Sequence, residues 1–406
     1  MNDVLSSDVN MKILADENIP SVNEAFGKFG SVERLSGRSI TASHLADVDV
    51  LLVRSVTTVG PHLLRESSVQ FVGSATIGTD HVDQRYLSEH GIAFHHAPAS
   101  NADSVADYVI AAMLDLASRR RAYLSDRTVG VIGCGNVGSR VAKRVSSLGA
   151  SVLCNDPPRV DAGETAPLDT EFVDIDVLYE AADVLTLHVP LTTEGPYPTH
   201  HLFDREALGK LQPGTWLLNT SRGAVVDNDA LRAALQEDRI GGAVLDVWEN
   251  EPEPDEALIQ AVDLATPHVA GYAFDGKIRA TKMLYDAFCD YLGVPVQWTG
   301  ESVLQPRSPD ELQCHPPDPR LSRTDWLLSL ARQAYDVRAD DRRMRQLLQR
   351  KPRDRGPYFA HLRATYPRRR EFQRQTVRRA GVPVALRPIV SQAFRLGWEE
   401  GVTHRL

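Results

Sequence analysis

Short apolar runs alternate with amphipathic stretches along most of this chain. Residues 50–53 and 69–72 are apolar runs typical of buried strands, and an amphipathic stretch precedes each of them. The alternation holds from residue 12 to about residue 99. It predicts a small α/β unit at the start of the chain.

A second and longer series begins after residue 102. Apolar residues recur at spacings of three and four through residues 102–121, which predicts a long helix. Apolar strands then alternate with helical or turn segments, at residues 128–132, 151–155, 183–189, 215–219, 243–247 and 263–266. Strands that are apolar on both faces and separated by helices predict a parallel, doubly wound α/β sheet of the Rossmann type.

The composition of the chain changes near residue 305. The sequence QPRSP at residues 305–309 is typical of a linker, which we place at residues 299–310. Arg becomes frequent beyond it, and helical patterns cover residues 325–334 and 341–348. We therefore predict a separate C-terminal α+β domain at residues 311–406.

The first ten residues are polar and include two acids, and the sequence MKIL at residues 11–14 has the pattern of a natural start. We predict a disordered extension at residues 1–10. It has neither the basic flank nor the apolar stretch of a secretory signal. No window of the chain is apolar for long enough to span a bilayer. We therefore expect a cytoplasmic protein that does not bind membranes.

Composition fits a globular protein of two or three domains, with 42% hydrophobic and 24% charged residues among 406. The net charge of −9 is unevenly spread. Residues 301–406 contain 22 Lys and Arg against 12 Asp and Glu, so they carry +10 and the first 300 residues carry −19. A basic segment can bind nucleic acid, but no reader motif or aromatic platform accompanies this one. We expect its arginines to pair with acids of the same chain or of a partner instead.

The four cysteines are scattered through the chain and have neither metal-ligand spacing nor the spacing of a disulfide framework, so we predict no metal site. They are Cys134, Cys154, Cys289 and Cys314.

A glycine motif directly follows the predicted strand 128–132 and opens a predicted helix. In Gly133-Cys134-Gly135-Asn136-Val137-Gly138 the first glycine permits a tight turn, the second lets the backbone approach a pyrophosphate, and the third lets helix and strand pack closely. Asp156 ends the next predicted strand, where an acid accepts hydrogen bonds from the ribose hydroxyls of NAD. Arg159 lies nearby, and a cation there could bind the 2′-phosphate of NADP. Asp156 nevertheless favours NAD.

Three polar residues follow later strands of the predicted sheet, where open α/β sheets place their ligands. They suit the oxidation of a small 2-hydroxy acid. The guanidinium of Arg222 can grip a carboxylate, His268 has the chemistry of a general base near neutral pH, and Glu251 can orient its imidazole. Glu249 and Glu253 compete with Glu251 for the acid role on sequence alone.

These segments together resemble the D-isomer-specific 2-hydroxyacid dehydrogenases over residues 12 to about 292. The resemblance rests on the glycine motif, Ser221-Arg222-Gly223, the segment 246–252 and the segment 267–271. It implies that Arg222, Glu251 and His268 are the catalytic residues. It also implies a substrate-binding domain at residues 11–101 and 269–298, of flavodoxin-like α/β type, and an NAD-binding domain at residues 102–268.

Further segments are similar to a branch of this family that oxidises a phosphorylated four-carbon 2-hydroxy acid in pyridoxal 5′-phosphate synthesis. They include residues 12–18, 53–57, 78–83, 156–159 and 195–197, and in the tail residues 335–338 and 366–372. The resemblance implies a homodimer formed through the C-terminal domain. It implies substrate contacts at Ser55, Thr76 and Tyr272. It implies NAD contacts at Gly133, Gly135, Asn136, Val137, Gly138, Asp156, Val189, Thr220, Ser221, Arg222, Asp246 and Gly271.

Two positions depart from the usual pattern of this family. Val189 stands where Thr is common, so only its backbone can be expected to contact NAD. Ala99-Ser100 replaces a more usual Gly-Cys, which affects the local loop geometry and no catalytic role.

A phosphorylated acid has an anionic group at each end and needs a cation at both. Arg222 serves one end. Arg54 is the candidate at the other, although an exposed surface arginine is an alternative reading of it, and an arginine from a partner subunit's C-terminal domain is another. A related enzyme such as 3-phosphoglycerate dehydrogenase and a non-catalytic NAD-sensing protein remain as alternative functions.

Overall fold

The computed structural model describes residues 10–305, 312–313 and 321–399. All but one residue of the predicted extension at 1–10 lie outside this range, as do Cys314 and residues 306–310 of the predicted linker. The chain divides into two compact units, Met1–Asn101 with Phe274–Pro306, and Ala102–Ala273 with Arg307–Leu406. We call them unit 1 and unit 2 and describe each by itself.

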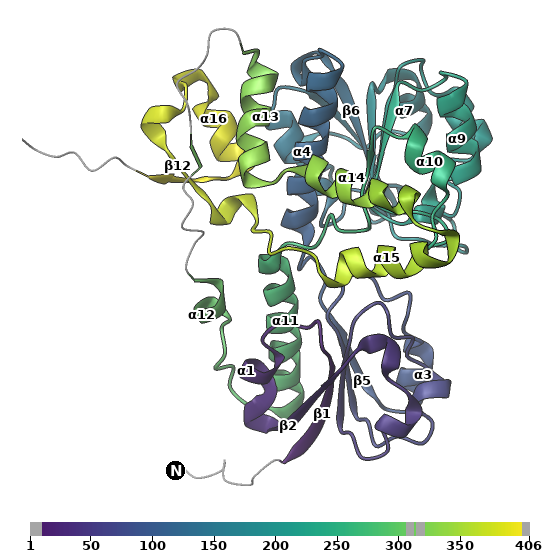
Figure 1. The fold of residues 1–406 in the computed structure, drawn as a ribbon, viewed down its shortest axis with the longest axis vertical. Helices are drawn as coiled ribbons and strands as arrows, with labels where there is room; N and C mark the ends of the chain where they lie inside the picture. Colours follow the sequence, from purple (N-terminus) through teal and green to yellow (C-terminus); the bar gives the residue numbers. More distant parts are fainter. Residues whose placement is uncertain (1–9, 306–311, 314–320, 400–406) are drawn as a thin grey trace, which may run out of the picture. The chain divides into compact units, whose positions relative to one another are not determined.

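Unit 1 is built on a five-stranded parallel sheet in the order β2-β1-β3-β4-β5 (Figure 1). Its strands are β1 (Met11–Asp16), β2 (Gly30–Leu35), β3 (Val50–Val53), β4 (Phe71–Ser74) and β5 (Ala93–His96). Its helices are α1 (Val22–Phe26), α2 (Pro61–Leu64), α3 (Gln84–Glu89), α11 (Phe274–Leu292) and α12 (Glu301–Leu304). The order is that of a flavodoxin-like sheet, as predicted.

Alternate side chains of these strands enter two separate cores. Ile13 and Leu52 pack with the aromatic residues of α1 and α11, whereas Leu14 and Leu51 pack with the side chains of α2 and α3. Successive residues of a strand point to opposite faces, so helices on both faces require strands that are apolar throughout. This explains the apolar run at residues 50–53.

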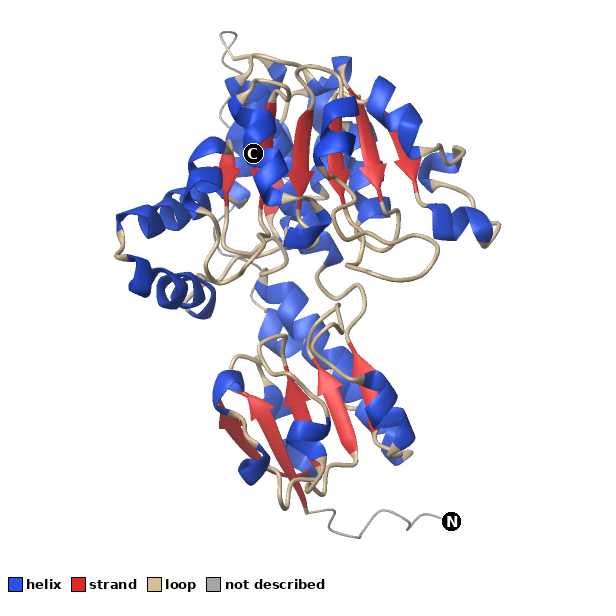
Figure 2. Ribbon diagram, turned by 90° about the vertical axis from the view of Figure 1, so that its right-hand side faces the viewer, coloured by secondary structure: helices blue, strands red, loops and turns tan. Residues whose placement is uncertain are grey.

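Unit 2 contains a six-stranded parallel sheet in the order β11-β10-β9-β8-β6-β7. Figure 2 draws the strands in red. The strands of this sheet are β6 (Thr128–Ile132), β7 (Ser151–Asn155), β8 (Val184–Leu187), β9 (Trp216–Asn219), β10 (Gly242–Leu245) and β11 (Leu264–Ala265). The helices that alternate with them are α4 (Ala102–Arg119), α5 (Gly138–Ser147), α6 (Pro157–Asp161), α7 (Ile175–Ala181), α8 (Arg205–Lys210), α9 (Asn228–Gln236) and α10 (Glu256–Ala261). The doubly wound fold class predicted from the sequence is confirmed.

Strand order in this sheet reverses beside β6, because β7 lies on one side of it and β8 on the other. Beyond β7 the next strand of a Rossmann sheet is reduced to a single bridge between Cys154 and Phe172. Doubly wound sheets bind ligands at the carboxyl ends of their strands, where the order reverses. The glycine motif lies at that position, directly after β6.

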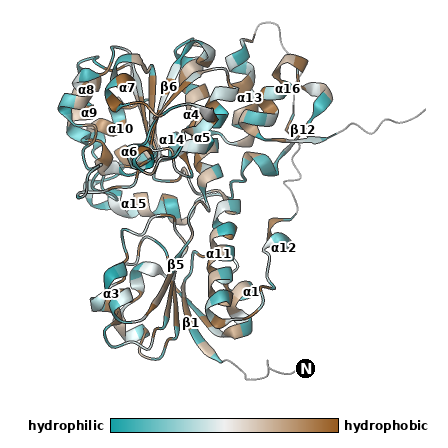
Figure 3. Ribbon diagram, turned by 180° about the vertical axis from the view of Figure 1, so that it is seen from behind, coloured by the Kyte–Doolittle hydropathy of each residue, from teal (hydrophilic) through white to brown (hydrophobic). Residues whose placement is uncertain are grey.

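The remaining elements of unit 2 come from the C-terminal segment. They are α13 (Arg323–Ala334), α14 (Val337–Arg345), α15 (Pro352–Ala364), α16 (Arg387–Ile389), β12 (Thr376–Arg378) and β13 (Gly397–Glu399). Leu327 and Phe372 join the core that covers one face of the sheet, and Met344 and Phe359 join the core of the other. Figure 3 colours the ribbon by residue hydropathy, with hydrophobic residues in brown. The C-terminal segment therefore shares both cores of the sheet.

Polar contacts join the C-terminal segment to the long helix α4, which is buried along nearly its whole length. Buried carboxylates on such a helix need cations, since an unpaired buried charge is very costly. Asp115 is fully buried and pairs with Arg332 of α13 at 2.9 Å and with Arg338 of α14. Asp107 pairs with Arg144 of α5 and accepts a hydrogen bond from the backbone N of Phe372 at 2.9 Å.

Candidate active site

The glycine motif forms a turn that fits a dinucleotide. Gly133 has φ of +81°, and a Cβ on Gly138 would lie 1.9 Å from the carbonyl oxygen of Gly133. A Cβ on Gly135 would meet no atom within 4 Å, so backbone is open to a ligand there. The turn leads into the ten-residue helix α5, whose N-terminal N–H groups suit a pyrophosphate.

Asp156 lies against this turn. Its Oδ2 accepts a hydrogen bond from the backbone N of Cys134 at 2.7 Å, and its side chain caps α6. Arg159 turns back to the same loop, where it donates to the carbonyl oxygen of Cys134 and pairs with Glu164 at 2.8 Å. The cation that could have suited NADP is thus engaged by protein groups.

A half-buried histidine directly after β8 was not expected from the sequence. His188 Nε2 lies 2.9 Å from Thr186 Oγ1, and its Nδ1 lies 3.3 Å from Thr220 Oγ1. Burial lowers the pKa of His188 to about 3, so the ring is neutral at physiological pH. A Cβ on Gly133 would lie 2.7 Å from the His188 carbonyl oxygen and 2.8 Å from Val189 Cγ1, so this segment forms a wall of the glycine turn. The only sequence signal was its place directly after a strand.

The buried side-chain amide of Asn219 organises the turn that contains Arg222. Asn219, at the end of β9, accepts hydrogen bonds from the backbone N and the Oγ of Ser221 at 3.0 and 2.7 Å. It also donates to the carbonyl oxygen of Arg222 at 2.8 Å. The half-buried guanidinium of Arg222 donates to the Ser221 carbonyl oxygen at 2.9 Å. The turn geometry is therefore fixed by protein contacts.

His268 and Glu251 form the acid–imidazole pair of the site. His268 Nδ1 lies 2.8 Å from Glu251 Oε2, and Glu251 Oε1 accepts a hydrogen bond from the backbone N of Trp248 at 3.0 Å. Burial alone would raise the pKa of Glu251, but the charge and hydrogen bond of His268, the charge of Arg363 and the Trp248 N–H together lower it. Glu251 is therefore an anion at neutral pH, held on the Nδ1 side of the ring.

The structure separates the three glutamates that the sequence left in competition. Glu249 pairs with His201 at 2.8 Å and accepts a hydrogen bond from the backbone N of Asn228 at 2.9 Å. Glu253 is exposed beside α15. Glu251 is the one in contact with His268.

Hydrogen bonds to Asp246 fix the loop that contains His268. His268 has φ of +58°, a conformation that residues other than glycine rarely adopt. Its backbone N donates to the Asp246 carbonyl oxygen at 2.7 Å, and the Asp246 carboxylate accepts from the backbone N of Val269 and of Ala270, each at 2.8 Å. Asp246 is almost fully buried and also accepts from Thr266 Oγ1 at 2.6 Å. Its side chain thus stabilises the strained loop.

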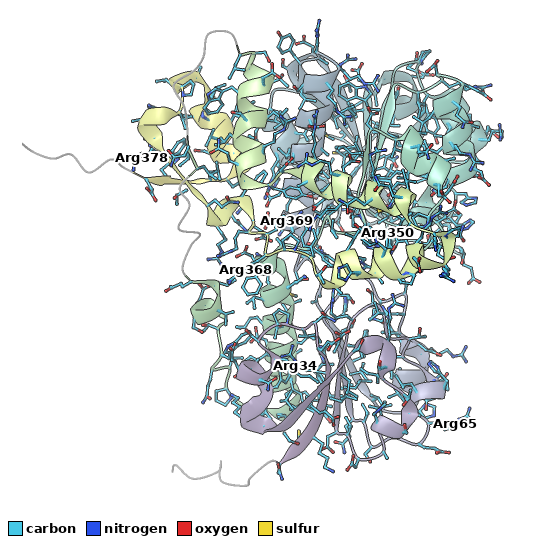
Figure 4. The ribbon with its side chains drawn as sticks, in the orientation of Figure 1. Arg34, Arg65, Arg350, Arg368, Arg369 and Arg378 are labelled. Carbon is cyan, nitrogen blue, oxygen red and sulfur yellow. The ribbon has the colours of Figure 1, made fainter. Side chains whose placement is uncertain are left out.

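The C-terminal segment reaches the other end of this loop, which sequence reasoning missed. Arg363, in the last turn of α15, donates from Nε to the hydroxyl of Tyr272 at 3.1 Å. Arg369, labelled in Figure 4, is buried and donates to the carbonyl oxygen of Ala270. Both arginines lie more than ninety residues along the chain from their partners. No local pattern could have indicated the contacts.

The three substrate-contact candidates of unit 1 follow adjacent strands of its sheet. Arg54 and Ser55 follow β3, and Thr76 follows β4. Ser55 is exposed, whereas Thr76 Oγ1 donates to the Gly78 carbonyl oxygen at 2.8 Å and lies 2.6 Å from Ser74 Oγ. Ala99, which stands where glycine is usual, has φ of +62°. All of these loops lie at the carboxyl edge of the unit 1 sheet.

Comparison with known proteins decides the family. The chain is 57% identical over 387 residues to the erythronate-4-phosphate dehydrogenase of Salinibacter ruber, covering 95% of this chain and 99% of that protein. It is 47% identical over 382 residues to the enzyme of the same name from Azotobacter vinelandii, covering 94% and 98%. The chain belongs to the erythronate-4-phosphate dehydrogenase family.

Family descriptions and solved structures agree with this membership. Residues 103–270 match the D-isomer specific 2-hydroxyacid dehydrogenase NAD binding domain, and residues 318–386 match a domain of unknown function, DUF3410. The D-lactate dehydrogenase of Aquifex aeolicus, solved with NAD and lactic acid, matches with a TM-score of 0.58 at 26% identity, over 70% of this chain and 96% of that chain. The TT0316 protein of Thermus thermophilus matches with a TM-score of 0.61 at 27% identity, over 70% and 98%.

This protein is an NAD-dependent oxidoreductase, as the sequence predicted. The predicted NAD cofactor is likewise confirmed. Among the residues that the structure describes, no helix has the length and apolar character needed to cross a bilayer.

Proposed function

We propose that this protein oxidises 4-phospho-D-erythronate to (R)-3-hydroxy-2-oxo-4-phosphooxybutanoate with NAD, in the synthesis of pyridoxal 5′-phosphate. Relatives at 57% and 47% identity carry the corresponding name over nearly their full length. The single observation that carries the chemistry is the 2.8 Å pair of His268 and Glu251 at the carboxyl edge of the NAD-binding sheet.

The residues around the glycine turn would hold NAD, which when bound would supply the acceptor for the hydride leaving C2 of the substrate. His268 takes the proton of the C2 hydroxyl on Nε2, the ring nitrogen that faces away from Glu251. The Glu251 anion fixes the ring orientation and stabilises the imidazolium that forms. Arg222 binds the substrate carboxylate and polarises the C2 oxygen, because its planar fork of donors matches a carboxylate. These three residues are the proposed catalytic set.

The proposed NAD contacts surround the glycine turn. Asp156 accepts from the ribose hydroxyls and disfavours a 2′-phosphate by charge repulsion. The other contacts are proposed at Gly133, Gly135, Asn136, Val137, Gly138, Val189, Thr220, Ser221, Arg222, Asp246 and Gly271. Asp246 also supports the loop that contains His268, through the hydrogen bonds described above.

Substrate contacts are proposed at Ser55, Thr76 and Tyr272, with Arg54 as a candidate for the phosphate. We retain the proposed division into a substrate-binding part at residues 11–101 and 269–298, an NAD-binding part at 102–268, a linker at 299–310 and a C-terminal part at 311–406. A homodimer formed through the C-terminal part and a cytoplasmic location also remain proposals. Light scattering on the purified protein tests the dimer, and a monomer at micromolar concentration would contradict it.

Purified protein supplied with NAD and one acid at a time provides the test of the reaction. We expect NADH formation with 4-phosphoerythronate and a kcat/KM at least about a hundredfold lower with D-lactate, which has no phosphate, or with 3-phosphoglycerate, which is one carbon shorter and cannot place both anionic groups in their sites. Activity confined to 3-phosphoglycerate would refute the substrate. Binding of NAD without turnover of any acid would favour the non-catalytic alternative.

A further inference from the structure

Helix α15 brings a cation from the C-terminal segment to the catalytic loop. Phe359 and Leu362 are buried on its inner face and join the same core as Leu258 of α10 and Leu245 of β10. Arg363 follows Phe359 by four residues, so it lies on the same face of the helix. The packing of α15 therefore directs Arg363 toward the sheet.

Tyr272 receives this arginine. The guanidinium lies over the Tyr272 ring, 5.5 Å from its centroid, and Nε donates to the hydroxyl at 3.1 Å. The other edge of the ring packs at 89° against Tyr366, whose hydroxyl donates to Asp340 Oδ2 at 2.6 Å. Tyr272 and Arg363 are thus held as a unit by elements of the C-terminal segment.

The remaining donors of Arg363 are not used by the residues that the structure describes. Within the described part of the chain, Nε makes the hydrogen bond to Tyr272, and neither Nη1 nor Nη2 makes any. The side chain is largely surrounded by protein, and donors at such a position are costly unless they meet an acceptor. A planar pair of N–H groups matches the oxygens of a phosphate or a carboxylate.

Arg363 belongs to the same site as the catalytic pair. Burial opposes its charge, but Tyr272 and Glu251 raise the pKa of Arg363, and Arg363 in turn lowers the pKa of Glu251. The two oxygens of Glu251 meet His268 Nδ1 and the Trp248 N–H, and among the described residues no ion pair joins Glu251 to Arg363. The positive charge of Arg363 is therefore available near the Glu251–His268 pair.

We propose that Arg363, held by Tyr272, binds the phosphate group of the substrate through Nη1 and Nη2. The inference rests on the proposed function, in which Arg222 binds the carboxylate and the phosphate still requires a cation. It assigns to the C-terminal segment a substrate contact made within its own chain. It also identifies a cation for the phosphate other than Arg54.

The test compares 4-phosphoerythronate with erythronate, which lacks the phosphate. Arg363→Ala should lower kcat/KM for the phosphorylated acid by about 10- to 100-fold, the range for a charge-assisted hydrogen bond, and leave the slow reaction with erythronate within about threefold. Arg363→Lys should lose less than Arg363→Ala. Arg353→Ala is the matched control on the same helix, because that side chain is 81% exposed, and it should change neither reaction.

Equal loss on the two acids would overturn the proposal, since it would mean that Arg363 only supports the loop. Selective loss of the phosphorylated reaction in Arg54→Ala, with none in Arg363→Ala, would also overturn it. Thermal unfolding and NAD affinity of each variant should match those of the parent protein. If Arg363→Ala does not fold, the Arg363→Lys and Arg363→Gln variants give the same comparison.

Titration with inorganic phosphate separates this proposal from the proposed reaction. With saturating NAD present, phosphate should bind the parent protein and bind Arg363→Ala at least about tenfold more weakly. Unchanged phosphate affinity overturns the anion site even if 4-phosphoerythronate is the substrate. Phosphate binding that depends on Arg363, with no turnover of 4-phosphoerythronate, would instead leave the anion site standing and refute the reaction.

Discussion

Asp107 on helix α4 should make the stability of unit 2 depend on pH. Its side chain is 2% exposed, pairs with Arg144 and accepts from the Phe372 backbone N. Burial raises the pKa of Asp107 to about 6 from 3.8, against the opposing charge of Arg144, and the charge of Glu371 adds to the rise. The carboxyl group is therefore easier to protonate in the folded protein than in the unfolded chain.

The sign and the size follow from linkage. Folding takes up a proton between pH 3.8 and 6, so this group favours the fold below pH 3.8, and that contribution is lost as the pH rises through 6. The pKa difference corresponds to about 3 kcal/mol, of which about 2 kcal/mol falls between pH 4.5 and 7.5. Because a typical domain is stable by only about 5–15 kcal/mol, the change is measurable.

Asp107→Asn removes the ionisation and keeps the shape of the side chain. The amide can accept from only one of Arg144 and Phe372, so we expect a loss of stability at low pH that does not depend on titration. Relative to the parent protein, the variant should then gain about 2 kcal/mol between pH 4.5 and 7.5. Asp126→Asn, an exposed position seven residues beyond the end of the same helix, is the control and should show no such gain.

Urea unfolding at the two pH values measures this difference. Tryptophan fluorescence reports mainly unit 2, because four of the five tryptophans lie there and only Trp298 lies in unit 1. A constant stability difference between variant and parent protein across this range would refute the reasoning, as would a difference that moves in the opposite direction. Either result would mean that Arg144 keeps Asp107 ionised in the fold.

Three further predictions concern the reaction. His268→Ala should lower kcat at least about a hundredfold, the usual contribution of a general base, with little change in NAD affinity by calorimetry; equal loss of both would place His268 in cofactor binding. Arg222→Lys should reduce kcat/KM severely because a point charge cannot replace a planar fork, and near-normal kinetics would remove Arg222 from the carboxylate site. Asp156→Ala should weaken NAD and narrow its preference over NADP; an unchanged NAD-to-NADP ratio of kcat/KM would show that selectivity lies elsewhere.

Local signals predicted much of the fold. The strands at residues 128–132 and 151–155 have the predicted ends, because each is a short apolar run bounded by turn residues. The strand expected at residues 69–72 instead spans Phe71–Ser74, and that expected at 183–189 spans Val184–Leu187. Periodicity locates an apolar run, but pairing with neighbouring strands decides where the ladder begins and ends.

The candidate site was predictable only where its chemistry is local. The glycine turn and Asp156 lie within 24 consecutive residues, so the spacing of the glycines and the acid was enough to find them. The choice among Glu249, Glu251 and Glu253 required the fold, because no local pattern shows that the first meets His201, the second meets His268 and the third is exposed. Arg363 could not be found at all, since nothing in an arginine-rich helix indicates which guanidinium faces a tyrosine 91 residues earlier.

The shared cores of unit 2 have a practical consequence for dissecting this enzyme. A chain cut after residue 305 would lose the side chains that complete both layers around the sheet, and the surfaces beneath Leu327 and Phe359 would meet water. It would also leave Asp115 without two of its three arginines. Such a fragment should aggregate instead of behaving as a minimal dehydrogenase. The boundary visible in composition is thus a poor guide to where the gene can be divided.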